Sequence, residues 1–223
     1  IKTFEALGVY GFSAITAITY QNDSEFKDLS WCASKEITRQ ISVLDFPFEF
    51  VKIGLVQNLE VLNVIIDFLY ECNPRVHIIW DPIIKASAGF EVHSAFHKEA
   101  LESTCKSLYA ITPNWQEMEH IAGSDALGYA KELSKYTNVL LKGGHKEDDN
   151  FCDRLIRLER VYEIKGSGEK LPAKHGSGCV YSSAVLAYLA KGVELNEACK
   201  HAKEYVESVL ASNESLLGYH KWK

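Results

Sequence analysis

The sequence lacks the spacings that would mark a metal site, a disulfide framework or a membrane segment. Its six cysteines are spread between Cys32 and Cys199, and no two of them form a CxxC pair. Zinc sites and small disulfide-stabilised proteins need closely spaced cysteines. No apolar stretch approaches the ~20 residues of a spanning helix, and the first residues lack an apolar signal core. We therefore expect a reducing, cytoplasmic setting and no membrane partner.

A basic run is also lacking. The chain has 24 Lys and Arg against 30 Asp and Glu, a net charge of −6, so nothing in it could track a phosphate backbone, and we expect no nucleic-acid partner. Repeats, low-complexity tracts and linkers are absent too. A chain of 223 residues with 47% hydrophobic content can bury a large core, and residues 1–223 are predicted to form a single domain.

Short apolar runs alternate with helical patterns, which indicates βαβ units and a mostly parallel sheet. The predicted strands cover residues 13–19, 50–53, 76–80, 108–111 and 139–141. Crossover helices are predicted at 59–70, 115–121 and 126–136, a buried helix at 180–190 and an amphipathic one at 195–210. Residues 151–172, around the glycine-rich stretch 165–168, fit an antiparallel hairpin at the edge of the sheet.

The clearest chemical motif is a glycine-rich turn, His175-Gly176-Ser177-Gly178-Cys179, directly before an apolar helix. Exposed backbone N–H groups and the positive helix end can cradle an anion such as a phosphoryl group. The same positive end would lower the pKa of Cys179 and make it a plausible base for a substrate hydroxyl. The alternative is a plain helix start with a structural cysteine.

A second motif lies where a predicted strand gives way to a helix, at Thr112-Pro113-Asn114-Trp115-Gln116-Glu117. Asn114 and Glu117 fall on one face of the first helical turn. Their oxygens could hold a hydrated Mg²⁺. An ordinary helix cap has the same pattern and is the favoured interpretation of this motif alone.

Three further polar positions follow predicted strands. Lys142 comes before a glycine pair, Asp81 before Pro82, and Gln21 after residues 17–20. The carboxyl ends of parallel strands form the ligand-binding crevice of α/β proteins, where Lys142 could neutralise phosphate charge. Taken singly, Lys142 is better explained as a solvated side chain beside a glycine turn, Asp81 has a turn-forming Asp-Pro pair as its alternative, and Gln21 is the weakest of the three signals. Their convergence on one edge favours a catalytic site.

At these residues the sequence resembles the ribokinase superfamily in its vitamin-kinase branch, and it is most similar to the hydroxymethylpyrimidine/phosphomethylpyrimidine kinases. Blocks similar to those of the family occur in order along nearly the whole chain, among them FVKIGL, WDPIIKASAG, ITPNWQEMEHIAG, VLLKGGH and HGSGCVYSSAVLAYLAKG. The resemblance implies a ribokinase-like α/β fold of three layers, with a mostly parallel central sheet flanked by helices and a small antiparallel edge hairpin. It also implies ATP and Mg²⁺ as cofactors, a small heteroaromatic alcohol as substrate, and a homodimer.

The resemblance further implies roles for single residues. Cys179 takes the place of the catalytic aspartate of related sugar kinases, and Gly176, Ser177 and Gly178 form the anion hole. The positions matching ATP, phosphate or Mg²⁺ sites are Lys142, Asp81, Asn114 and Glu117, the last two through water at the metal. Gln21 matches the glutamine that faces the pyrimidine, and Ile83 lines the same pocket.

Two alternatives remain open from the sequence. Pyridoxal or pyridoxine kinases share the cysteine-bearing loop and act on similar flat alcohols, and a catalytically silent vitamin-binding module is the second possibility. The family's first strand and glycine-rich loop have no counterpart in the chain, whose first block begins at Ile1 in mid-motif. We therefore expect that residues precede Ile1 in a longer polypeptide.

Overall fold

A six-stranded sheet forms the centre of the protein. The structure, a computed structural model, describes residues 1–22, 25–84, 97–143 and 152–221. The strand order is β3-β4-β5-β6-β7-β8, in which β3 to β6 are parallel and β7 and β8 are added antiparallel. The bounds are β3 (Phe50–Ile53), β4 (His77–Trp80), β5 (Ala110–Ile111), β6 (Asn138–Leu141), β7 (Asp153–Arg157) and β8 (Arg160–Ile164).

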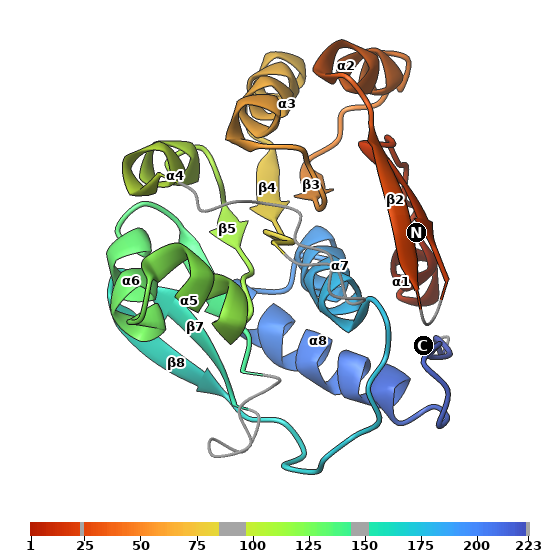
Figure 1. Cartoon of the computed structure of the whole chain (residues 1–223), viewed down its shortest axis with the longest axis vertical. Helices are drawn as coiled ribbons and strands as arrows, with labels where there is room; N and C mark the ends of the chain where they lie inside the picture. The colour runs from red at the N-terminus through yellow and green to blue at the C-terminus, as the bar shows by residue number, and fades with distance from the viewer. Residues whose placement is uncertain (23–24, 85–96, 144–151, 222–223) are drawn as a thin grey trace.

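Helices cover both faces of this sheet (Figure 1). One face packs against α3 (Leu59–Cys72), α4 (Lys98–Cys105), α5 (Trp115–Ala122) and α6 (Ala126–Leu133), with α2 (Ser34–Ser42) beside α3. The other face packs against α1 (Lys2–Ala6), α7 (Ser177–Ala190) and α8 (Leu195–Leu210). The predicted three-layer α/β architecture is confirmed.

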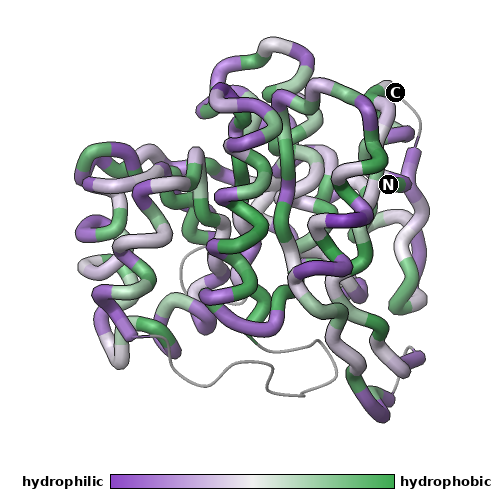
Figure 2. Tube along the Cα trace, turned by 90° about the horizontal axis from the view of Figure 1, so that it is seen from above, coloured by the Kyte–Doolittle hydropathy of each residue, from purple (hydrophilic) through white to green (hydrophobic). Residues whose placement is uncertain are grey.

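Alternation along the strands explains the two cores. In β4, Ile78 and Trp80 join the core under α3 to α6, whereas Ile79 between them joins the core under α7 and α8. Successive side chains of a strand point to opposite faces, and a parallel sheet covered on both sides therefore reads as a continuous apolar run. Figure 2 shows the hydrophobic segments running through the middle of the molecule. Among the described residues, no helix is long and apolar enough to cross a membrane.

The predicted strand at 13–19 is wrong in its start and in its partner. The strand in this region is β1 (Ala17–Gln21), which pairs antiparallel with β2 (Phe26–Trp31) in a separate two-stranded sheet. Figure 1 shows this hairpin standing beside the main sheet, next to α1. Apolar residues are not enough to place a strand in the core: Ile18 and Tyr20 of β1 remain about half exposed.

The predicted edge hairpin is confirmed as β7 and β8, but its turn is not the glycine-rich stretch 165–168. The chain turns at Leu158 and Glu159, which both have positive φ, 46° and 64°. The glycine-rich stretch instead follows β8. A Cβ atom at Gly166 would lie 2.0 Å from Oε1 of Glu207, so this glycine serves close packing against α8.

The other predicted elements agree with the structure to within a few residues. The strand at 50–53 and the helix at 195–210 have the predicted bounds, and the remaining parallel strands begin within two residues of theirs. The helix predicted at 126–136 ends at Leu133. Three helices were not predicted: α1, α2 and α4.

Candidate active site

Four polar side chains surround one buried carboxylate at the carboxyl edge of the parallel sheet. Asp81, directly after β4, is only 2% exposed. Its Oδ1 accepts hydrogen bonds from Nζ of Lys142 (2.8 Å) and Oγ1 of Thr112 (2.9 Å), and its Oδ2 from Oγ of Ser182 (3.0 Å). Nζ of Lys52, in β3, lies 3.6 Å from Oδ2. The structure therefore joins two residues predicted to lie at strand ends, Asp81 and Lys142, in one cluster.

This cluster carries more positive than negative charge. Burial acts to raise the pKa of Asp81, but the charges of Lys142 and Lys52, with hydrogen bonds from Lys142 and Thr112, hold it well below its usual range. Burial acts to lower the pKa of Lys142, but Asp81 and Glu117 outweigh that and raise it. The carboxylate and the Lys142 ammonium therefore both stay charged at neutral pH. With one carboxylate between two lysines, the site can attract an anion.

The predicted anion-binding turn faces the same lysine. Gly176 precedes α7 in the left-handed conformation, at φ 72°, which a residue with a side chain adopts only at a cost. A Cβ atom at Gly178 would lie 3.2 Å from Nζ of Lys142. The N–H groups of the first turn of α7, including that of Ser177, and the Lys142 ammonium thus lie together, an arrangement suited to phosphate.

Cys179 is the third residue of α7 and lies among the charges of this cluster. Burial raises the pKa of its thiol, and the charge of Asp81 adds to that effect, whereas Lys52, which also hydrogen-bonds the sulfur, and Lys142 lower it. The balance is a raised pKa. The expected lowering by the helix end is therefore wrong for the protein as it stands, because loss of water around the sulfur outweighs the positive groups beside it.

Asn114 and Glu117 form the helix cap that the sequence favoured. The side chain of Asn114 accepts the N–H of Glu117 (2.8 Å), and Oε2 of Glu117 accepts the N–H of Asn114 (2.7 Å). The cap is also tied to the site, because the N–H of Trp115 bonds the carbonyl of Lys142 (2.9 Å).

The buried environment of Glu117 disfavours the charged form of its carboxylate. Burial raises its pKa to about 7, and Asp81 adds to the rise, although Lys142 and the backbone N–H groups of Asn114 and Ile84 oppose it. A carboxylate that burial destabilises fits a nearby cation. Within the described part of the chain no group of three or more His, Cys, Asp and Glu side chains could hold a metal. A Mg²⁺ ion there would therefore keep most of its waters, as Mg²⁺ commonly does.

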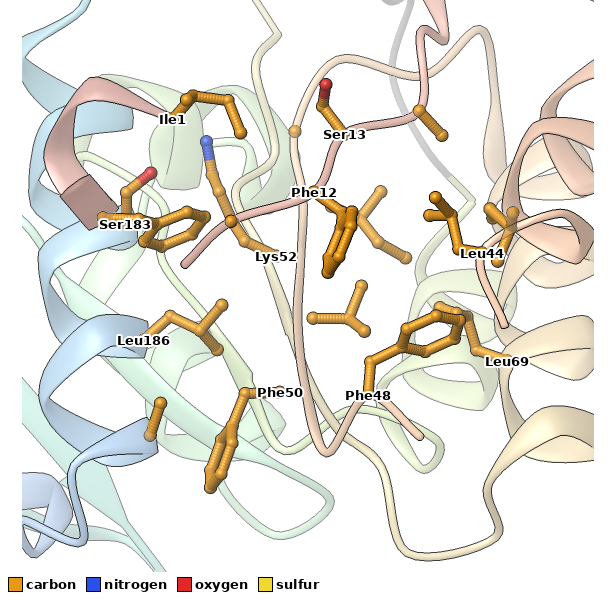
Figure 3. A pocket seen from close by; sticks show the side chains of 18 of the residues that line it. Ile1, Phe12, Ser13, Leu44, Phe48, Phe50, Lys52, Leu69, Ser183 and Leu186 are labelled. Carbon is orange, nitrogen blue, oxygen red and sulfur yellow. The ribbon is translucent and has the colours of Figure 1, made fainter. Parts of the chain in front are cut away.

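A pocket of about 700 Å³ adjoins the cluster. Its walls come from α7, from β3 with the residues on either side of it, and from residues 9–14 and the α2 and α3 region. Figure 3 shows Leu186, Phe48 and Leu69 pointing into it, and the labelled polar side chains are those of Ser13, Lys52 and Ser183. Cys179 also lines this pocket, so the mostly apolar space reaches the catalytic candidate.

Neither of the two predicted substrate-binding residues is among those that line this pocket. Gln21 is exposed on β1, where its Nε2 donates to Oγ1 of Thr19 (3.1 Å). Ile83 is half-buried two residues after Asp81, and its Cδ1 would lie 3.9 Å from a Cβ atom at Gly54. Their roles therefore remain predictions. The KASAG stretch and the glycine and histidine that follow Gly143 lie outside the described residues.

Sequence reasoning missed Lys52 and Ser182, and treated Thr112 only as a candidate cap. Lys52 had a signal: it is the one charged residue in the apolar run 50–53. Its side chain is only 13% exposed, which a solvated strand lysine would not be. Ser182 gave no signal, because a small polar residue inside a helix is unremarkable without its buried partner.

A family described as phosphomethylpyrimidine kinase matches residues 1–221. The chain belongs to this family. A hydroxymethylpyrimidine/phosphomethylpyrimidine kinase of Aquifex aeolicus is 30% identical to it over 97% of the chain and 89% of that protein. The resemblance seen in the motifs is thereby confirmed.

Solved structures agree with this family membership. A phosphomethylpyrimidine kinase from Clostridium difficile 630 is 32% identical, with a TM-score of 0.71 over 92% of this chain and 88% of the other. The pyridoxal kinase from Staphylococcus aureus in complex with ADP gives 0.81 over 95% and 81%, at 23% identity, which shows a shared fold. The ribokinase-like fold class is confirmed for this phosphomethylpyrimidine kinase family member.

Proposed function

We propose that the protein transfers the γ-phosphoryl group of ATP to the primary alcohol of hydroxymethylpyrimidine, to the phosphate of that compound, or to both, in thiamine biosynthesis. One observation carries the proposal beyond family membership. The Lys142 ammonium, the first turn of α7 and Cys179 are gathered where a pocket meets the carboxyl edge of the sheet. Positive groups fixed in advance around a phosphoryl group are what catalysis of its transfer mainly requires.

The side chains of the site would divide the work. Lys142, held by Asp81, and the N–H groups of residues 176–178 would bind the phosphoryl group in transfer. Cys179 would accept the proton of the substrate hydroxyl, with Lys52 beside its sulfur. Bound Mg²⁺ would offset phosphate charge, and Glu117 and Asn114 would hold it through water.

Product analysis by mass tests the proposal. Hydroxymethylpyrimidine, its phosphate and pyridoxal would each be offered in parallel with ATP and Mg²⁺. We expect the pyrimidine or its phosphate to gain one phosphoryl group at a higher kcat/KM than pyridoxal. A preference for pyridoxal would make the protein a vitamin B6 kinase, and binding of a vitamin precursor with no product at all would support the silent module.

We also propose a cytoplasmic homodimer. Its support is a group of exposed apolar side chains on the β1–β2 hairpin and around α2, among them Ile15, Ile18, Tyr20 and Val43, which are 50 to 75% exposed. Exposed apolar patches often mark association surfaces. Light scattering after size exclusion would give about twice the 25.1 kDa of the chain for a dimer, and substituting Ile18 by Asp should then return the monomer mass.

A further inference from the structure

A second buried charged cluster lies behind the candidate active site, and the catalytic proposal does not use it. Asp153, the first residue of β7, is 1% exposed. Its Oδ1 accepts the backbone N–H of Gly143 (2.7 Å), and its Oδ2 lies 3.0 Å from Nζ of Lys203 in α8. The Lys203 side chain is only 8% exposed.

This second cluster touches the strand end that carries Lys142. Gly143 follows Lys142, and a Cβ atom at Gly143 would lie 2.1 Å from the carbonyl oxygen of Cys152. The backbone at 143 is thus pressed against β7, and Asp153 is the side chain that bonds its N–H. This contact fixes the backbone at the end of β6, and with it the position of the Cα atom from which the Lys142 side chain extends.

The cluster also touches α7. The hydroxyl of Tyr181 donates a hydrogen bond to the carbonyl of Cys199 (3.3 Å) and lies close to Asp153: burial raises the pKa of Tyr181, and the neighbouring carboxylate adds to the rise. The next residue, Ser182, donates to Asp81. Neighbouring residues of α7 therefore face two different buried carboxylates, one in each cluster.

A third connection runs to the segment that leads into the anion-binding turn. Oε1 of Glu207 lies 4.0 Å from Nζ of Lys203, and its two oxygens accept the N–H of Ser167 at 3.1 and 3.0 Å. Ser167 lies between β8 and the turn at 176–178. The Asp153 cluster thus contacts the strand end at Lys142, the first half of α7 and the chain that precedes it.

Stability alone does not explain such a cluster. Two buried charges lose their hydration, and apolar side chains of similar volume often stabilise a protein as well or better. An apolar pair could not, however, accept the N–H of Gly143. What the carboxylate contributes specifically is a fixed acceptor at the end of β6.

We propose that Asp153 is a positioning residue, which holds Lys142 and the first turn of α7 at the spacing that a transferring phosphoryl group requires. The inference rests on the proposed kinase function. It predicts that loss of the acceptor at 153 impairs the use of ATP more than the use of the alcohol.

The test compares two double variants with matched charge, Asp153→Asn/Lys203→Met and Asp153→Leu/Lys203→Met. Both remove the buried ion pair, and only asparagine still accepts the N–H of Gly143. Because a small displacement of a catalytic group can cost about 100-fold in rate, we expect the leucine variant to have a kcat/KM for ATP about 10- to 100-fold below that of the asparagine variant. The KM for the alcohol should differ between them by less than about threefold. Equal kcat/KM for ATP in the two variants would overturn the proposal.

Two additional measurements keep the result unambiguous. If the leucine variant fails to fold, Asp153→Glu takes its place, because it keeps the ion pair but displaces the carboxylate by one methylene. A purely structural ion pair would tolerate this change. A kcat/KM for ATP in the Asp153→Glu variant equal to that of the wild type would therefore refute the positioning role. If the wild-type protein phosphorylates none of the alcohols, the proposed function fails. Calorimetric titration with Mg·ADP then decides separately: at least tenfold weaker binding to the leucine variant than to the asparagine variant supports the inference, and equal binding rejects it.

Discussion

Glu117 offers a quantitative test of the electrostatics of the site. Burial is the main reason why its pKa rises from 4.5 to about 7. The folded protein therefore binds this proton more tightly than the unfolded chain does. The stabilisation by this group is complete below pH 4.5 and is lost as the pH rises through 7. At about 1.4 kcal/mol for each pH unit between the two values, the loss amounts to roughly 3 kcal/mol.

Replacing Glu117 by Gln removes the titration. The glutamine has one acceptor oxygen where the carboxylate has two, which weakens the hydrogen bonds from the N–H groups of Asn114 and Ile84, but the amide itself does not titrate. Urea unfolding at pH 5, 6, 7 and 8 would give the free energy of unfolding of both proteins. We expect the wild-type value minus the variant value to fall by roughly 2.5 kcal/mol across the series, because part of the total loss has already occurred at pH 5.

A matched control and Mg²⁺ make the test specific. Glu60 is exposed in the first turn of α3, so Glu60→Gln should follow the wild-type pH dependence. Parallel curves for Glu117→Gln and wild type, within about 0.5 kcal/mol, would refute the reasoning from burial. With ATP, Glu117→Gln should be less active at low Mg²⁺ and partly restored by more, because a charge near the metal is lost. Unchanged Mg²⁺ dependence would leave Glu117 with a capping role only.

Three other substitutions test the assigned roles. Cys179→Ala should lower kcat by about two to four orders of magnitude with little change in ATP affinity. Because the pKa of the thiol is raised, the kcat of the wild-type protein should continue to increase with pH into the alkaline range. An alanine variant with wild-type turnover would remove Cys179 from the mechanism. Gln21→Ala should raise the KM for the pyrimidine more than that for ATP, because an amide can pair with a ring nitrogen and its amino neighbour; equal changes would count against this role. Asp81→Asn should cost about 3–5 kcal/mol in urea unfolding, because Lys142 and Lys52 lose their buried counter-charge; a loss under about 1 kcal/mol would show that water reaches them.

The parts of the fold that could be predicted are those in which periodicity and burial coincide. Residues 195–210 alternate apolar and polar side chains at helical spacing, and α8 has those bounds. In residues 13–19 the same kind of apolar signal misled, because the hairpin of β1 and β2 stands apart from the main sheet and leaves Ile18 half exposed. Periodicity reports a preferred local conformation, whereas the partner of a strand depends on the rest of the chain.

In the candidate site, too, the local features could be predicted and those that depend on distant parts of the chain could not. Asp81 and Lys142 could be predicted because each follows a buried parallel strand, and parallel strands end at a common edge. The thiol pKa of Cys179 could not, because the helix end is a local feature and the burial of the sulfur is not. Lys52 was missed for a related reason: the apolar run around it was the only local signal, and its partner Asp81 lies 29 residues further along the chain.

The turn between β7 and β8 explains why glycine was a poor guide there. Leu158 and Glu159 both adopt positive φ, which costs an ordinary residue about 1–2 kcal/mol. Ser134, at the end of α6, offsets that cost, because its carbonyl accepts the N–H of Leu158 (3.2 Å) and its Oγ accepts the N–H of Glu159 (2.8 Å). The turn is thus held by another element, whereas Gly166 packs closely against α8 and Gly168 adopts a positive φ of 74° in the segment after β8. The segment after β8 leads to the anion-binding turn before α7. The contact between α6 and the hairpin therefore fixes the starting point of the segment that leads back to the active site.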